Sequence, residues 1–126
     1  MGEIEHATAL RAALEVPLGV WSAYDYDDVP DVLPNLYVLI TVSRRYGGQP
    51  RMCGGRPVHG WRLTTLAVGR TTDEARFIRD ATAAALADKT VTVGGVVSTR
   101  IRFETEQPVA PDDGRQSGLT AWTYAL

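Results

Sequence analysis

Residues 61 to 93 constrain the fold most, because they predict a strand, a capped helix and a second strand in succession. Residues 61–68 are rich in β-branched and aromatic side chains, and Gly69 ends this run where the chain must turn. Thr71 is then placed as a helix N-cap, with Glu74 able to reach back to the N–H of the cap residue. We therefore expect a helix that packs on a sheet.

The body of this helix, residues 75–87, is alanine-rich and contains neither glycine nor proline. Its apolar side chains repeat at helical spacing and form one stripe, made of Ile78, Ala81, Ala85 and Leu86 and widened by Phe77 and Ala84. This stripe is predicted to face the sheet.

A second helix is predicted over residues 3–15. Apolar side chains spaced three and four apart define its buried side, namely Ile4, Ala7, Leu10 and Leu14. Pro17, just after this segment, is expected to keep the helix from extending. His6 is placed on the exposed side.

Between the two helices, residues 18–24 predict a brief strand and residues 36–43 an interior strand, continued by 44–46. Residues 47–57 contain two glycine pairs and two prolines, and predict a long hairpin loop leading into the strand at Trp61. Because little in this loop can be buried, we expect it to be mobile in the isolated chain and to become ordered against a partner.

The last third of the chain predicts more strands, at residues 90–93, 96–99, 100–106 and 119–126, with a turn-rich connection at 108–118. Gly94 and Gly95 suit a tight hairpin, and Ile101 and Phe103 alternate with charged residues, so one side of the sheet is expected to face solvent. The predicted fold class is α+β, a mainly antiparallel sheet with two helices packed on one face and a long β-hairpin loop.

Composition agrees with one domain over residues 1–126, since the chain has 126 residues, 44% of them hydrophobic. No apolar run approaches the ~20 residues that span a bilayer, and the N-terminus lacks a signal-peptide pattern, so we expect a protein made in a cytoplasm, with no membrane partner. Cys53 is the single cysteine and has no second cysteine for a disulfide or a zinc site.

Charge is unevenly distributed along the chain. The first 35 residues hold seven acids, Glu3, Glu5, Glu15, Asp25, Asp27, Asp28 and Asp31, against the single base Arg11. Residues 36–70 hold six arginines, Arg44, Arg45, Arg51, Arg56, Arg62 and Arg70, and no acid. These are either two solvated faces or two complementary docking surfaces. The docking hypothesis places partner contacts at Arg44, Arg45, Arg51 and Arg56 and at Asp25, Asp27, Asp28 and Asp31.

No catalytic, cofactor or metal site is predicted. His6 and His59 have no nucleophile or acid at a useful spacing, and the hairpin glycines lack the lysine and helix start of a phosphate loop. The aspartates at 25–31 lack the central glycine and final glutamate of an EF-hand. Cys53 lies among arginines that favour a reactive thiolate, so an enzyme acting through this thiol stays an alternative, to be tested by thiol-dependent turnover.

Five short segments in a fixed order resemble tail terminator proteins of long-tailed bacteriophages and prophages. They are residues 34–38 at the first long strand, 68–75 at the capped helix, 91–95 after that helix, 111–114 before the closing strand, and 121–124 within it. The resemblance covers most of the chain, and residues 47–57 match least well.

The resemblance implies an assembly role without catalysis. Tail terminators form a ring of subunits, six in the family, that caps the tail tube at its final length and presents a surface to the head connector. It implies a homo-oligomer located in the virion tail or neck after assembly in the host cytoplasm, with the tube protein and the connector as partners and DNA only as passing cargo. Two alternatives stay open: a neck protein of the same module, and a ferredoxin-like regulatory domain that binds a small molecule.

Overall fold

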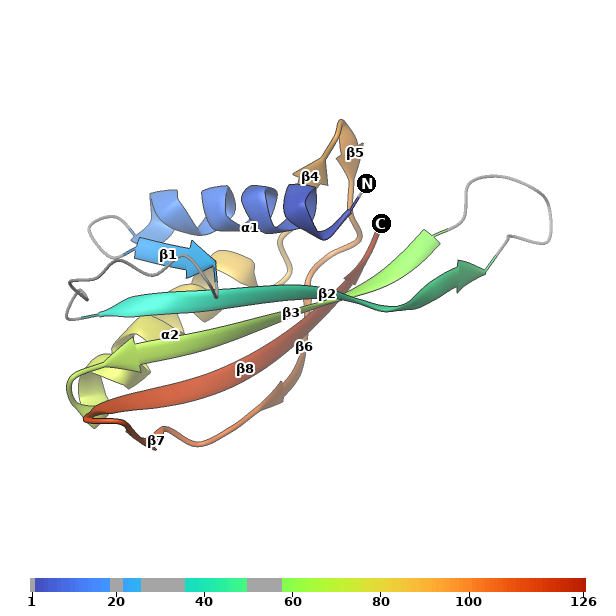
Figure 1. The fold of residues 1–126 in the computed structure, drawn as a ribbon. Coiled ribbons are helices and arrows are strands. Elements are labelled where there is room, and N and C mark those ends of the chain that lie inside the picture. Colours follow the sequence, from blue (N-terminus) through green and yellow to red (C-terminus); the bar gives the residue numbers. More distant parts are fainter. Residues whose placement is uncertain (1, 19–21, 26–35, 50–57) are drawn as a thin grey trace.

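The computed structural model describes residues 2–18, 22–25, 36–49 and 58–126, without the side chains of residues 15–18, 22, 25, 45–49 and 58–59. Within these residues, two helices and eight strands follow one another in the order α1 (Glu3–Leu18), β1 (Ser22–Asp25), β2 (Tyr37–Gln49), β3 (Val58–Gly69), α2 (Thr72–Leu86), β4 (Thr92–Val93), β5 (Val96–Val97), β6 (Arg102–Glu106), β7 (Ala110–Asp112) and β8 (Arg115–Ala125). Figure 1 shows how these elements are arranged.

A six-stranded sheet forms one layer, with the order β1-β2-β3-β8-β6 and with β7 paired to β8. Among the described strands, β1 pairs with β2 in parallel and the other pairings are antiparallel, so the sheet is mixed but mostly antiparallel. Both helices lie on the same face, α1 against β1 and β2 and α2 against β3 and β8 (Figure 1). The predicted α+β class is confirmed.

The core lies between this face and the helices. The register of β2, β3 and β8 places Ile40, Leu63 and Trp122 on the inner face, and helix residues such as Leu10 and Ile78 pack against them. Side chains alternate between the two faces of a strand, so the residues between these core positions point to the opposite face.

The start of α2 follows the predicted cap in part. The Thr71 hydroxyl accepts a hydrogen bond from the N–H of Glu74 at 3.2 Å, as expected. The Glu74 carboxylate, however, accepts from the N–H of Arg70 at 3.0 Å, one residue before the cap. The hydrogen bond from the Arg70 side chain, at 3.3 Å, lowers the pKa of Glu74, and the hydrogen bond from the Arg70 backbone N–H acts in the same direction.

Gly69 has a different role from the predicted one. A Cβ atom at this position would lie 2.6 Å from the backbone nitrogen of Ala75 and 2.8 Å from the Cβ of Glu74. Glycine is therefore required because the start of α2 passes directly over the end of β3, a close approach that leaves no room for a side chain.

The buried stripe of α2 differs in part from the predicted one. Ala75, Ile78, Thr82 and Leu86 are buried, and the Thr82 hydroxyl donates to the Ile78 carbonyl at 2.8 Å. Phe77 is 52% exposed and Ala84 is exposed, so neither widens the stripe. The buried positions are three or four residues apart and define the face of α2 that contacts the sheet. Phe77 and Ala84 are seven residues apart, so they share a different face of the helix, which is exposed.

Helix α1 corrects the prediction in two respects. It runs to Leu18, with Pro17 in its last turn, where the missing N–H costs a single terminal hydrogen bond. His6 is fully buried, whereas Ile4 is 80% exposed. The buried positions Leu10 and Leu14 follow His6 at steps of four, so the histidine belongs to the stripe and the isoleucine lies outside it.

Two tight hairpins complete the C-terminal half. Gly94 and Gly95, with φ values of 57° and 82°, join β4 to β5 as predicted. Asp113 and Gly114, with φ values of 49° and 81°, join β7 to β8. Positive φ at both central residues is typical of a type I′ turn. Consequently β8 begins at Arg115, earlier than the predicted Leu119, and part of the predicted turn-rich connection is a strand.

The part of β2 and β3 beyond Arg44 and Trp61, here called the arm, continues away from the body of the molecule (Figure 1). Its pairing reaches Gln49 opposite Val58, after register shifts on either side of Tyr46. The arm is therefore longer than predicted, because Gly47 and Gly48 belong to β2. Residues 50–57 lie outside the described residues, and the predicted mobility of this hairpin loop stays a prediction.

Candidate assembly surfaces

The sheet face opposite the helices, here called the open face, is organised in three rows across the strands. The first row is apolar and half-buried, and consists of Tyr24, Leu39, Leu66 and Leu119. The second consists of Thr41, Thr64, Ala121 and Thr105. The third consists of Ser43, Arg62, Thr123 and Arg102. The face thus changes from apolar to charged towards the arm.

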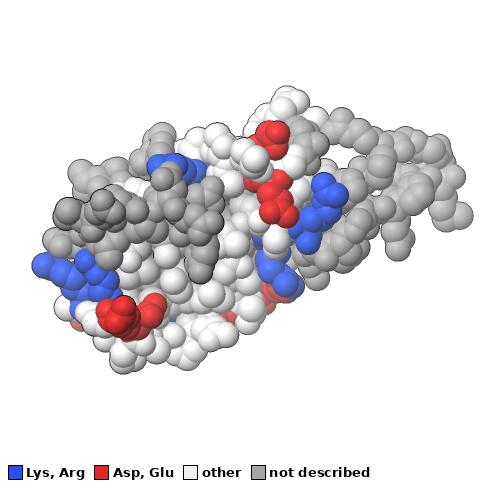
Figure 2. Space-filling view, in the orientation of Figure 1, with Lys and Arg blue, Asp and Glu red and all other residues white. Residues whose placement is uncertain are grey.

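Figure 2 views the molecule from the side opposite α2. Among the described residues, Figure 2 shows an uncharged area between two mixed groups of acidic and basic side chains, one at the left end and one near the middle of the view, with a further basic group at the upper edge. Such a surface offers an uncharged contact area bordered by both signs of charge, a pattern that suits docking with a polar rim.

Two arginines of the acid-free stretch 36–70 are neutralised within the chain. Arg62 donates from Nε and Nη2 to the two carboxylate oxygens of Glu104, at 3.0 and 2.7 Å, and this fork raises the pKa of Arg62. Arg70 pairs with Glu74 at 3.3 Å. The positive charge of this stretch is thereby reduced by acids from outside it.

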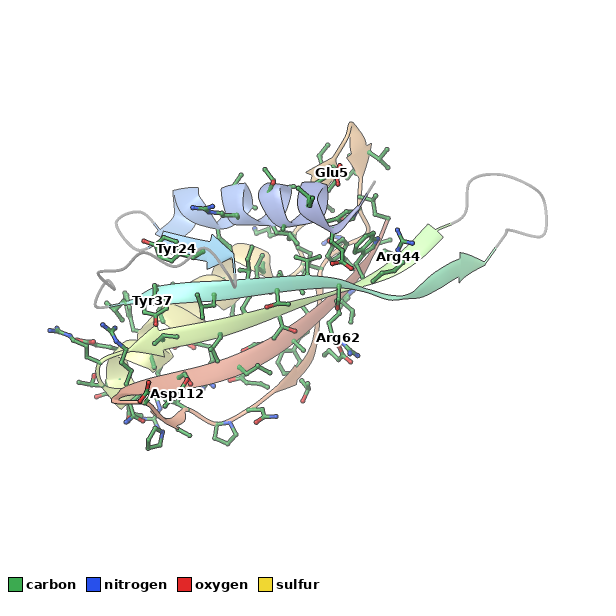
Figure 3. The ribbon with its side chains drawn as sticks, in the orientation of Figure 1. Glu5, Tyr24, Tyr37, Arg44, Arg62 and Asp112 are labelled. Atoms are coloured by element: carbon green, nitrogen blue, oxygen red, sulfur yellow. The ribbon has the colours of Figure 1, made fainter. Side chains whose placement is uncertain are left out.

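A shallow hollow of about 230 Å³ lies on the open face near the turn between β7 and β8. We call it the Tyr37 hollow. The described residues that line it are Tyr37, Leu39, Leu66, Val68, Asp112, Asp113 and Arg115. The Arg115 guanidinium carbon lies 5.6 Å from the Tyr37 ring centroid, and Asp112 accepts a hydrogen bond from the Ser117 hydroxyl at 3.0 Å. Figure 3 shows Tyr37 and Asp112 at the end of the sheet away from the arm.

At the opposite end of the sheet, a buried aromatic cluster fixes the base of the arm. His6 Nδ1 lies 2.6 Å from the Tyr124 hydroxyl, and the Arg44 guanidinium carbon lies 5.2 Å from the Trp61 ring centroid. Within the described residues, His6 Nε2 and Trp61 Nε1 have no hydrogen-bond partner. Burial lowers the pKa of His6 and raises the pKa of Tyr124, so both groups are neutral near pH 7. The cluster is structural, and sequence reasoning missed it by placing His6 on the surface.

The structure describes few of the predicted partner-contact residues. Arg44 is exposed and lies against Trp61. Arg45 and Asp25 belong to β2 and β1, but their side chains are not described. Arg51, Arg56, Asp27, Asp28 and Asp31 lie outside the described residues. Docking between the acidic and arginine-rich stretches therefore stays a prediction.

Two further features bear on function. Within residues 2–18, 22–25, 36–49 and 58–126, no three histidine, cysteine, aspartate or glutamate side chains are placed to hold a metal ion together. Neither described helix combines the length and apolar character that crossing a membrane requires.

Comparisons with known proteins show the fold. No protein-family model matches the chain, and no curated protein matches it. Solved structures with a similar fold include the following two. One chain, which bears no functional name, superposes with a TM-score of 0.67 at 12% identity, over 99% of this chain and 95% of its own length. The other belongs to the virion of a native gene transfer agent particle, with a TM-score of 0.64 at 15% identity, over 94% of this chain and 92% of its own length. The chain thus shares its fold, over 94% of its length, with a chain of that virion.

Proposed function

We propose that this chain is a structural protein of a phage-like virion, and within that class a tail terminator. In this role copies of the chain form a ring that caps the tail tube at its final length and presents a surface to the head connector. The observation that carries the proposal is the fold shared over 94% of the chain with a chain of a gene transfer agent virion. The role requires no catalytic step and no cofactor.

The open face and the arm support an assembly role. Both helices lie on the other side of the sheet, so the row of Tyr24, Leu39, Leu66 and Leu119 has no helix packed on it. Apolar rows of this kind bordered by charge mark protein contact surfaces. The arm projects beyond the body (Figure 1), as expected of an element that reaches a neighbouring molecule.

The test is the tail phenotype of particles assembled without this chain. A tail terminator is expected to leave tails of uncontrolled length that do not join heads, as measured by electron microscopy. Tails of normal length that fail to join heads would instead identify a neck protein. Particles with normal tails joined to heads would reject the proposal.

A matched pair of variants then tests the open face. Thr41→Arg places a long charged side chain at an exposed position of the second row, and Thr90→Arg makes the same change at an exposed threonine between α2 and β4. We expect both proteins to fold, with only Thr41→Arg failing to restore tails of normal length. If both variants restored tails of normal length equally well, the open face would not be an assembly surface.

A further inference from the structure

The Tyr37 hollow and the arm lie at opposite ends of the same strand. Tyr37 is the first residue of β2, and Gln49, the last paired residue of the arm, is the last of β2. A strand rises ~3.3 Å per residue, so these twelve steps separate hollow and arm by roughly 40 Å. Figure 3 agrees, with Tyr37 and Arg44 at well-separated places along β2. The arm therefore cannot enter the hollow of its own chain.

The chemistry of the hollow suits a long cationic side chain. Its floor is apolar, formed by Tyr37, Leu39, Leu66 and Val68. Of the described residues at its rim, Asp112 and Asp113 carry carboxylates and Arg115 carries a guanidinium. Among the described residues Asp113 has no ion pair, and the aromatic ring of Tyr37 already lies beside one guanidinium. An arginine can place its methylene stem on such a floor and its charged head among the carboxylates.

The arm supplies that kind of side chain. Of the six arginines in residues 36–70, Arg62 and Arg70 are paired with acids of their own chain. By sequence, the strands of the arm and the residues joining them carry Arg45, Arg51 and Arg56, with no acid among them. The arm is thus a source of arginines, and the described lining of the hollow carries more negative than positive charge.

We propose that the Tyr37 hollow of one copy receives an arginine from the arm of a second copy. The contact joins two different surfaces, so it is heterologous and builds a ring when its rotation closes. It rests on the proposed function only in that a closed ring is the form this function needs. The acidic partner of the arm is then the Asp112–Asp113 turn, in place of the acidic stretch at residues 25–31.

Cross-linking tests the contact directly, because Cys53 is the single cysteine and lies in the segment that joins the two strands of the arm. Ser117→Cys places a second thiol beside the hollow with little change in size, since Ser117 bonds Asp112 at its rim. Treatment with a short bismaleimide is expected to produce a ladder of covalent multimers on a denaturing gel. The ladder should vanish in Ser117→Cys/Cys53→Ser.

The control cysteine lies in the helix layer. Ala84→Cys puts the thiol on the exposed side of α2, and this variant should give no more multimers than the natural chain. A ladder from Ala84→Cys equal to that from Ser117→Cys would overturn the proposal, as would the absence of any Cys53-dependent ladder in rings that form normally.

Neutralising variants test the charges. Asp113→Asn keeps a residue type that tolerates the positive φ of 49°, and Asp112→Asn keeps an acceptor for Ser117. We expect Asp112→Asn/Asp113→Asn and Arg51→Gln/Arg56→Gln each to weaken association about tenfold or more, as measured by light scattering against concentration. The combined variant should be no weaker than either alone, because both remove one contact. Asp80→Asn on α2 is the matched control. If the combined variant lost as much association as the sum of the two separate losses, the pairing of the aspartates with the arginines would be refuted.

The outcomes separate this inference from the proposed function. Rings that cap tails but give no Cys53-dependent ladder would refute the contact and leave the function standing. A ladder of covalent multimers, together with non-additive losses in the charge variants, would establish the contact. If the same protein did not affect tails, the tail role would be rejected.

Discussion

The imidazole of His6 stacks on the indole of Trp61, with ring centroids 3.7 Å apart and 20° between the ring planes. The same imidazole bonds the hydroxyl of Tyr124, which is 118 residues away in sequence. One side chain therefore joins the first turns of α1 to β3 and β8. This junction lies where the arm leaves the body, next to Arg44 (Figure 3).

Tyr124→Phe is expected to lower the free energy of unfolding by about 1–3 kcal/mol. The change keeps the ring but removes the hydroxyl, which leaves His6 Nδ1 buried without its partner. Denaturant unfolding measures the loss. Tyr24→Phe is the control, because Tyr24 is half-buried and its hydroxyl has no hydrogen bond among the described residues. Equal losses in the two variants would show that the His6 contact contributes nothing.

Gly69→Ala is expected to destabilise the protein by about 1–3 kcal/mol or more, because the new methyl group would overlap the backbone of Ala75. Thermal unfolding is the measurement. Gly2→Ala is the control, since among the described residues an added Cβ there meets the Glu5 carboxylate alone, at 3.4 Å. A melting temperature that does not change in Gly69→Ala would mean that α2 can move away from β3 at no cost.

The Thr71 cap provides a third prediction. Thr71→Ala removes the hydroxyl that accepts from the N–H of Glu74 and is expected to cost about 1 kcal/mol. Thr71→Ser keeps that hydroxyl and should retain most of the stability. If the serine variant loses as much as the alanine variant, the threonine methyl group and not the hydrogen bond stabilises this helix start.

Much of the fold could be predicted because its signals are local. The β-branched runs, the Thr71 cap and the glycine pair at 94–95 each determine a short segment, and the structure has the expected element at each place. The segment 111–114 was harder to interpret, since Asp113 and Gly114 form a hairpin turn with strands on both sides. Its β7 partner is only three residues long, too short to show a period of two.

The candidate surfaces could not be predicted, because they depend on which residues become neighbours across strands. Leu39, Leu66 and Leu119 form one row only through the register of three strands. The pairing of Arg62 with Glu104 likewise joins positions 42 residues apart. The burial of His6 did have a local signal, because His6 lies four residues before Leu10 and eight before Leu14, which are both buried. A search for helical periodicity that counts only apolar residues does not include a histidine.

The last prediction concerns pH. Burial is the main cause that lowers the pKa of His6 in the fold. The positive charges of the N-terminal amine and of Arg44 act in the same direction, and the negative charge of Glu5 opposes them. In the unfolded chain the pKa of histidine returns to about 6.5. A lowered pKa in the fold means that the unfolded state binds the proton more readily, so the stabilising contribution is complete above about pH 6.5 and decreases as the pH falls below it.

We therefore expect the free energy of unfolding to fall by up to about 1.4 kcal/mol for each pH unit below 6.5, until His6 itself is protonated in the fold. His6→Phe should be less stable than the natural chain near pH 7.5, because the Tyr124 hydroxyl loses its partner, but should show a smaller loss between pH 7.5 and 5.5. His59→Asn, which alters the second histidine, is the control and should keep the pH dependence of the natural chain.

Denaturant unfolding at a series of pH values gives the slope of the free energy of unfolding against pH for all three proteins. A slope in His6→Phe as steep as that of the natural chain would contradict the assignment of this pH dependence to His6. Carboxylates that titrate in the same range contribute equally to the three proteins, so the difference between slopes isolates His6.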